Sequence, residues 1–352
     1  MPLSNKIKER IALEVIRTLV TRFENFPENA NNNRNAPFHE AFLSAFSEKF
    51  KKNVSDIPFF ISLSSWMHGL NTTLGQTFFE NIAHHISQGE KREYTSKRLG
   101  NLLILQQQRD NISQIIADLS NSTASPSLIS ENQLLFQNSN SNIIDAMDFS
   151  ADIFIEDNHS ITAIELKSVK PNSGEMKGEK QKILEGKAAL YRKFPEKEIY
   201  FYIGFPFDPT VDVTNDKNTS YDKVRFLDQI INMGKFFDPK ETLVASELWD
   251  MLSGCSDTME QILDIINKIS TTDFLDKYRY LNENINRNKK QYQDILGHWF
   301  LISELEIVKN QKEIQDSIIG NKALERCFNH TMFNKATYNI NRYAELTKYI
   351  SK

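Results

Sequence analysis

One short stretch in the middle of the chain constrains the fold most, because it has the pattern strand, turn, strand, helix, strand. The segments ADIFIE (151–156) and ITAIELK (161–167) have the apolar, β-branched composition of strands, and DNHS (157–160) between them is a turn sequence. An amphipathic helix is expected over 180–193, followed by the aromatic strand EIYFYIGF (198–205). This order predicts a compact α/β core with a small mixed sheet.

Helical periodicity dominates both ends of the chain. Only 12 glycines and 10 prolines occur in 352 residues, which disfavours an all-β fold with many tight turns. Apolar residues at three- and four-residue steps predict helices over 6–23, 74–86, 97–119 and 258–269. The Asn-rich segment 28–36 is expected to be a loop, and the Ser- and Asn-rich segment 121–143 a loop or a loop around a short element.

These patterns predict three regions along the chain. Residues 1–130 form a helical N-terminal region, 131–250 the α/β core, and 251–352 a helical C-terminal region. We expect them to pack as one compact unit, an α/β fold with large helical additions at both ends.

Composition excludes several classes of protein. The chain has 42 Lys and Arg against 46 Asp and Glu, a net charge of −4, so it is not a strongly basic nucleic-acid coat. Its two cysteines are too few for a disulfide framework or a cysteine-rich zinc site. It contains no apolar run of the roughly 20 residues that span a bilayer, no secretory signal pattern and no phosphate-binding glycine motif. A cytoplasmic protein is expected.

Two carboxylates and an amine are predicted to meet at one end of the hairpin. Alternate side chains of a strand share a face, so Glu165 and Lys167 point to the same side while Leu166 points into the core. Asp152 begins the strand that pairs with theirs. Two carboxylates suit Mg²⁺, a hard ion that prefers oxygen ligands, and a neighbouring ammonium offsets charge on a reacting phosphate. These are the groups that a phosphodiester hydrolase needs, although alternating charged and apolar residues also occur in any half-exposed strand.

Local charge favours the hydrolase interpretation. The tract 166–193 holds eight Lys or Arg residues and three Glu, a local charge of +5 in a chain of −4, which suits a phosphate backbone.

Three longer motifs carry a resemblance to a known family. Asp152 with Glu165-Leu166-Lys167 resembles the PD-(D/E)XK nuclease signature, and 165–194 is similar to the catalytic segment of type II restriction endonucleases of the TdeIII family. The stretches WMHGLNTTLGQTFFENIAHHIS (66–87) and LVASELWDMLSGCSDTMEQILDIIN (243–267) are similar to that family as well. Together they cover most of residues 60–270.

The resemblance implies a restriction-endonuclease-like mixed β-sheet core flanked by helices. It also implies Mg²⁺-dependent cleavage of double-stranded DNA at a short interrupted palindrome of the GGNCC kind, usually by a homodimer. A cognate methyltransferase would protect the host DNA. Asp152 and Glu165 would hold the metal and Lys167 would complete the catalytic set. Ala151 stands where the signature has proline, and Asp148 is the alternative to Asp152.

Further site residues are predicted with open alternatives. In nucleases of this fold a preceding helix often adds a carboxylate near the metal, and Glu80 fits that place unless it is a solvated or capping residue. His84 and His85 on the same helix face DNA or simply pack. Lys180 and Gln181 are expected to open a helix, whose N-terminus attracts phosphate. Lys170 and Lys177 are predicted to position the DNA backbone, and Gln181 to contact a phosphate or the metal shell. Lys180, Lys277 and Arg279 are predicted to contact DNA as well, with a solvated helix or a charged connection as the alternative.

Three functions remain open at this point. The first is a Mg²⁺-dependent type II restriction endonuclease. The second is a repair, resolvase or nicking nuclease on the same core, and the third is a non-catalytic DNA- or partner-binding protein in which the triad is coincidental.

Overall fold

The chain divides into two compact units, which we describe separately. The computed structural model describes residues 2–27, 41, 43, 57–137, 139–167, 174–212 and 214–350, so the loop predicted over 28–36 lies outside the described residues. Unit 1 comprises Met1–Leu3 and Phe79–Gln261, and unit 2 comprises Ser4–Phe78 and Ile262–Lys352. The three regions expected from the sequence, with boundaries near 130 and 250, stay a prediction.

Unit 1 contains the α/β core. Its strands are β1 (Glu90–Tyr94), β2 (Leu103–Leu105), β3 (Ile143–Asp145), β4 (Phe149–Glu156), β5 (Ser160–Leu166), β6 (Glu198–Phe205) and β7 (Thr242–Val244). Its helices are α5 (Phe79–Ser87), α6 (Gln106–Asn121), α7 (Leu128–Leu135), α8 (Glu175–Lys193), α9 (Lys223–Gln229), α10 (Met233–Phe236), the 3₁₀ turn η3 (Pro239–Glu241) and α11 (Ser246–Ser253). Helix α12 (Thr258–Ile269) contributes residues to both units.

Five of these strands form one mixed sheet in the order β1-β4-β5-β6-β7. Strand β4 is antiparallel to both β1 and β5, whereas β5, β6 and β7 run parallel. Helix α8 makes the crossover that a parallel β5–β6 pair requires. The mixed sheet flanked by helices confirms the predicted fold class.

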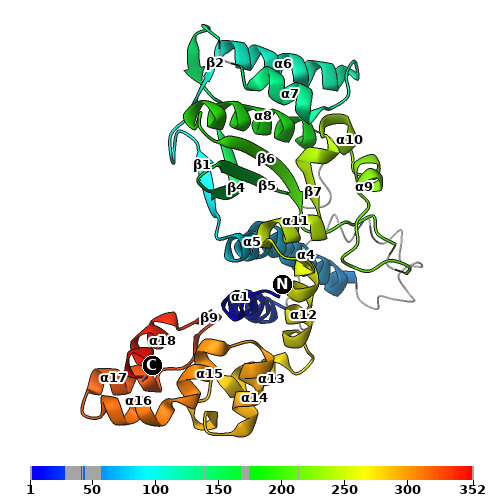
Figure 1. Ribbon diagram of the computed structural model, residues 1–352. Coiled ribbons are helices and arrows are strands. Elements are labelled where there is room, and N and C mark those ends of the chain that lie inside the picture. The colour runs from blue at the N-terminus through cyan, green and yellow to red at the C-terminus, as the bar shows by residue number, and fades with distance from the viewer. Residues whose placement is uncertain are drawn as a thin grey trace. The chain divides into compact units, whose positions relative to one another are not determined.

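Helices cover both faces of the sheet, as Figure 1 shows for α8 on one side and α5 and α11 on the other. Gly186 marks the close approach of α8, because a Cβ there would lie 2.5 Å from a ring carbon of Phe201 on β6. Gly204 marks the opposite face, where a Cβ would meet Leu248 of α11 at 3.2 Å. Helices α6 and α7 add a further layer outside α8 (Figure 1).

Asp157 fixes the turn between β4 and β5. One of its carboxylate oxygens accepts hydrogen bonds from the main-chain N–H groups of His159 and Ser160, each at 2.7 Å, and the other accepts from the Ser160 hydroxyl at 2.8 Å. This aspartate turn sets the register of the hairpin, in which Ile153 pairs with Ile164 and Glu156 with Ile161.

The described residues of unit 2 are helical apart from one two-residue strand pair. Its elements are α1 (Asn5–Glu24), α4 (Ile57–Thr73), the π-helix η2 (Leu74–Phe78), α13 (Phe274–Leu281), η4 (Asn284–Asn286), α14 (Lys290–His298), α15 (Ile302–Lys309), α16 (Gln311–Ile318), α17 (Lys322–Asn329), β8 (Phe333–Asn334), β9 (Thr337–Tyr338), α18 (Ile340–Leu346) and η5 (Thr347–Tyr349). Phe274 stacks on both Phe23 of α1 and Trp299, with ring centroids 5.8 and 5.4 Å apart, so the N-terminal helix packs against the C-terminal part of the chain.

Most predicted elements are confirmed, and the errors lie at element ends. The hairpin strands, the strand over 198–205 and the helices over 6–23 and 258–269 lie where they were expected. The helix predicted over 97–119 is wrong in its first part, because the chain forms β2 before α6 begins at Gln106. The helix predicted from residue 74 starts instead as a π-helical segment, with α5 beginning at Phe79. Segment 121–143 holds α7 and the start of β3.

Candidate active site

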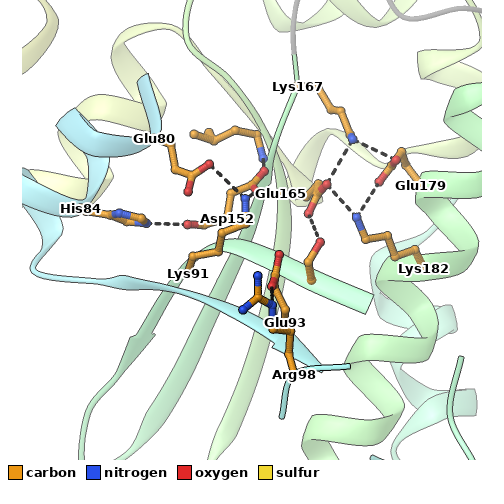
Figure 2. A network of polar contacts seen from close by, with 12 residues as sticks. Glu80, His84, Lys91, Glu93, Arg98, Asp152, Glu165, Lys167, Glu179 and Lys182 are labelled. Carbon is orange, nitrogen blue, oxygen red and sulfur yellow. Dashed lines mark hydrogen bonds and ion pairs between the residues drawn. The ribbon is translucent and has the colours of Figure 1, made fainter. Parts of the chain in front are cut away.

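Asp152 and Glu165 come together where β4 and β5 stop pairing. The last residue pair between the two strands is Ile153–Ile164. Beyond it, a side chain takes the place of a main-chain partner, because Asp152 Oδ2 accepts a hydrogen bond from the Leu166 N–H at 3.0 Å. Glu165 is buried, with 4% of its surface exposed, while Leu166, expected in the core, is half-buried. The predicted convergence of these two carboxylates is present in the structure (Figure 2).

Two lysines neutralise Glu165. Its Oε1 lies 3.1 Å from Lys167 Nζ and 2.7 Å from Lys182 Nζ, and Lys182 reaches it from α8. Glu179, one turn before Lys182, lies 2.9 Å from Lys167 and 3.6 Å from Lys182. Two carboxylates and two ammonium groups therefore form a closed cluster at the end of β5 (Figure 2).

Burial and charge act in opposite directions on this cluster. Burial raises the pKa of Glu165, the Asp152 carboxylate raises it further, and Lys182 and Lys167 oppose both, with a net rise. Burial lowers the pKa of Lys167, but the carboxylates of Glu165 and Glu179 outweigh burial and hold it above its ordinary value. Lys167 is therefore a fully charged ammonium at neutral pH.

Glu80 and Asp152 are joined by a third lysine. Lys91, on β1, lies 3.1 Å from Glu80 Oε2 and 3.0 Å from Asp152 Oδ1. Burial lowers the pKa of Lys91, but hydrogen bonding and charge from Asp152 and Glu80 raise it above its ordinary value. Helix α5 also supplies His84, whose Nε2 donates to the Asp152 main-chain carbonyl at 2.6 Å. Glu80 thus lies beside the predicted triad, and His84 fixes the backbone of β4 there.

The donor set suits a hard divalent cation. Asp152, Glu165 and Glu80 offer carboxylate oxygens, which Mg²⁺ and similar ions prefer, and ammonium groups already balance their charge. Within the described part of the chain, no group of three or more His, Cys, Asp or Glu side chains is drawn together tightly enough to hold an ion as they stand. An ion at this place would be held by two carboxylates, with water completing its shell.

Lys180 does not lie where the sequence placed it. Helix α8 begins at Glu175, so Lys180 and Gln181 do not open a helix. Lys180 is fully buried, ion-paired with Glu131 at 2.6 Å and with Glu241. Lys187 is buried as well and lies 3.1 Å from Glu241. The structure therefore gives no support to a direct DNA contact by Lys180, which instead neutralises buried carboxylates.

The other predicted contacts are spread over the chain. Lys177 is exposed on the first turn of α8 and Gln181 is half-buried, with its Nε2 3.3 Å from Met147 Sδ. Lys170 lies outside the described residues. Lys277 and Arg279 belong to unit 2, on α13, in i→i+4 and i→i+3 pairs with Asp273 and Asp276.

Asp148, the alternative to Asp152, is exposed in the segment before β4, where its Oδ1 accepts a hydrogen bond from Asn101 at 2.7 Å. Asp152, by contrast, is part of the polar network around Glu165 that Figure 2 shows. The geometry favours Asp152 as the metal-binding aspartate.

Sequence reasoning missed three residues of this site. Lys91 lies on β1, a strand whose sequence EKREY contains too few apolar residues to be predicted. Glu179 and Lys182 were assigned to a basic tract as a whole, although their i→i+3 spacing places both on one side of a helix. A prediction of α8 from Glu175 onwards would have put that pair beside the end of β5.

Comparison with known proteins gives the family. The family model described as "Type II restriction endonuclease, HinfI" matches residues 3–270, about three quarters of the chain. The chain belongs to the HinfI family of type II restriction endonucleases. It is also 42% identical over 373 aligned residues to "Type II restriction enzyme MjaII" of Methanocaldococcus jannaschii, and the alignment covers 100% of this chain and 99% of that relative. No solved structure matches the chain.

Family membership answers the question that the sequence left open. The protein is a type II site-specific deoxyribonuclease, which acts on double-stranded DNA. The repair-nuclease and non-catalytic interpretations are therefore set aside. Enzymes of this type generally use divalent metal ions, in keeping with the carboxylates around Asp152. None of the helices in the described ranges has both the length and the apolar character needed to cross a membrane.

Proposed function

We propose that this restriction endonuclease hydrolyses DNA with Mg²⁺ held by Asp152 and Glu165, and that Lys167 completes the catalytic set. The observation that carries the proposal is the meeting of these three side chains at the divergent end of the β4–β5 hairpin, in a chain of the HinfI family. The same observation supports a PD-(D/E)XK assignment. The resemblance to the TdeIII family rests on sequence motifs alone.

Each residue has a distinct task in this proposal. A divalent ion, when bound, polarises the phosphate and lowers the pKa of a coordinated water. Asp152 is held in place by the Leu166 N–H, so its carboxylate keeps a fixed orientation. Lys167, gripped by Glu165 and Glu179, places a permanent positive charge beside the carboxylates. That charge offsets the negative charge that accumulates on the transferring phosphoryl group.

Glu80 takes a supporting part. Its carboxylate lies within reach of the ammonium that also contacts Asp152, so it belongs to the same electrostatic unit. We assign it the role of a carboxylate near the metal, supplied by the helix before the hairpin.

DNA contacts are proposed for cations outside the catalytic cluster. Lys177 is exposed near the start of α8 and suits backbone positioning, and Gln181 lies on the same helix. Lys170 remains a proposal from sequence. Lys277 and Arg279 are proposed as groove contacts, in which an arginine or lysine reads guanine O6 and N7.

A short palindrome of the GGNCC kind is the proposed target, and a homodimer the proposed assembly. A two-fold dimer presents one active site to each strand of a palindrome. A methyltransferase that protects the host DNA and a cytoplasmic location follow from the same proposal.

Digestion of DNA of known sequence tests both the reaction and the target. With Mg²⁺ we expect discrete fragments whose mapped ends share one short palindrome. Lys167→Ala should abolish cleavage and leave specific binding largely intact, as measured by gel shift in Ca²⁺. Lys197→Ala is the matched control, because Lys197 ion-pairs with Glu156 at 2.7 Å at the opposite end of the hairpin. Normal cleavage by Lys167→Ala would contradict the assignment.

A further inference from the structure

Lys91 is a cation of the site that the sequence analysis did not mention. It lies on β1 at the point where the β1–β4 register shifts, between the pairs Glu90–Phe154 and Arg92–Ala151. A β-bulge re-aims a side chain, and here the ammonium reaches Asp152 Oδ1 and Glu80 Oε2 at 3.0 and 3.1 Å. Figure 2 shows it between the two carboxylates.

We propose that Lys91 is a built-in counter-cation of Asp152, which a divalent ion must displace from Oδ1 in order to bind. The inference rests on the proposed function, because it takes Asp152 as a metal ligand. In the protein without metal, the Lys91 ammonium group already occupies the position beside Asp152 Oδ1.

The two oxygens of Asp152 explain why displacement is required. Oδ2 accepts the Leu166 N–H, so Oδ1 is the oxygen that an ion would take, and Oδ1 is the one that Lys91 contacts. A Mg²⁺–oxygen bond of about 2.1 Å and an ammonium hydrogen bond of 3.0 Å on the same oxygen would bring two positive centres close together. Like charges at such a separation repel strongly in a partly desolvated site.

Glu80 can hold the Lys91 ammonium after it leaves Asp152. It holds the same Nζ at 3.1 Å from a different element, α5, so Lys91 can leave Asp152 without losing every carboxylate. The Lys91 side chain is 37% exposed, which gives it room to move, whereas Lys167 is 16% exposed and shared by Glu165 and Glu179. Lys91 is therefore the cation that yields, and Lys167 the one that remains.

The experiment measures Mn²⁺ binding to the full-length protein without DNA, by the loss of the free-ion electron paramagnetic resonance signal. Lys91→Met removes the competing charge and keeps the length of the side chain. Lys97→Met is the matched control, since Lys97 is an exposed lysine just after β1 that pairs with no acidic side chain among the described residues. Asp152→Asn, alone and combined with Lys91→Met, tests the ligand itself.

We expect Lys91→Met to bind Mn²⁺ on the order of tenfold more tightly than wild type, and Lys97→Met to match wild type. The gain should vanish in the double variant with Asp152→Asn. Unchanged or weaker binding by a folded Lys91→Met would overturn the displacement of Lys91. If Asp152→Asn binds Mn²⁺ as wild type does, the proposed metal site fails instead, so the two failures are distinguishable.

A second measurement needs no substitution. Amine-reactive labelling of the wild-type protein, read by peptide mass spectrometry, follows Lys91 with and without Mn²⁺. An ammonium released from Asp152 should label several-fold faster when Mn²⁺ is present, while Lys97 in the same digest keeps its rate. An equal labelling rate of Lys91 in both conditions would overturn the inference.

Discussion

The buried ion cluster under α8 allows a sharp test of how this fold is held together. Lys180 has no exposed surface, and its Nζ contacts Glu241 and lies 2.6 Å from Glu131. Lys187 supplies a second buried ammonium, 3.1 Å from Glu241. Two positive and two negative charges thus balance inside unit 1, and they tie α8 to α7 and to η3.

Lys180→Met should destabilise unit 1 by about 3–5 kcal/mol, the usual cost of removing one partner from a buried ion pair. Methionine preserves most of the side-chain volume, so a cavity contributes little. The cost arises because two buried carboxylates are left with one ammonium. Glu131 would bear most of it, since Lys180 is its ion-pair partner whereas Glu241 keeps Lys187. A melting temperature lower by about 10 °C corresponds to this loss.

Urea unfolding, followed by hydrogen exchange of the α8 amides, measures the change in unit 1 itself. Lys177→Met is the control, because Lys177 is exposed one turn earlier on the same helix and should change stability by less than about 0.5 kcal/mol. The double variant Lys180→Met/Glu131→Gln should recover part of the loss, since it removes the unpaired charge. Equal stabilities for Lys180→Met and Lys177→Met would refute the reasoning.

Three further predictions follow from the site and the hairpin. Excess EDTA should abolish plasmid cleavage and added Mg²⁺ should restore it, so undiminished cutting in EDTA would contradict a metal-dependent reaction. Glu80→Gln should lower the cleavage rate by about 10–100-fold in single-turnover digestion, as for residues that support a metal site, and a wild-type rate would exclude that role. The Lys197 ammonium lowers the pKa of Glu156 in the folded protein by hydrogen bonding. The pair therefore stabilises the fold fully at a pH above the pKa that Glu156 has in the unfolded chain, and this stabilisation is lost as the pH falls through the lowered pKa of the folded state. Wild type should therefore exceed Glu156→Gln in stability at neutral pH and converge with it once the pH falls below the lowered pKa of Glu156, and a gap that widens in acid would contradict the sign.

The centre of the fold was predictable because its sequence obeys local rules. The β4–β5 hairpin combines alternating burial with an aspartate turn, so both strands and the approach of Asp152 to Glu165 follow from residues close in sequence. Lys91 was not predictable, because its approach depends on a register shift between β1 and β4, whose partners lie about 60 residues apart. No local pattern encodes such a shift.

Element ends were the least predictable feature, and one error changed a functional prediction. Gly174 stands at the N-cap of α8 and makes no side-chain cap, so the sequence carries no strong start signal before Glu175. The predicted helix began at residue 180, which would place Lys180 at an exposed helix N-terminus. In the structure the helix begins at Glu175, and Lys180 contacts Glu131 of α7 and Glu241 of η3. Both partners are distant in sequence, so a local pattern could not predict them.

The basic tract 166–193 shows why local charge is a poor measure of a DNA-binding surface. Its excess of +5 predicts a phosphate-facing helix, yet Lys180 and Lys187 neutralise carboxylates in the interior and Lys182 neutralises Glu165. The positive charge of α8 balances the carboxylates of the elements that pack against it. What remains for DNA on this helix is the exposed minority, including Lys177. Substitutions on this one helix therefore separate two effects. Replacing an exposed lysine should lower the salt dependence of DNA binding, whereas replacing a buried lysine should lower the stability of the fold.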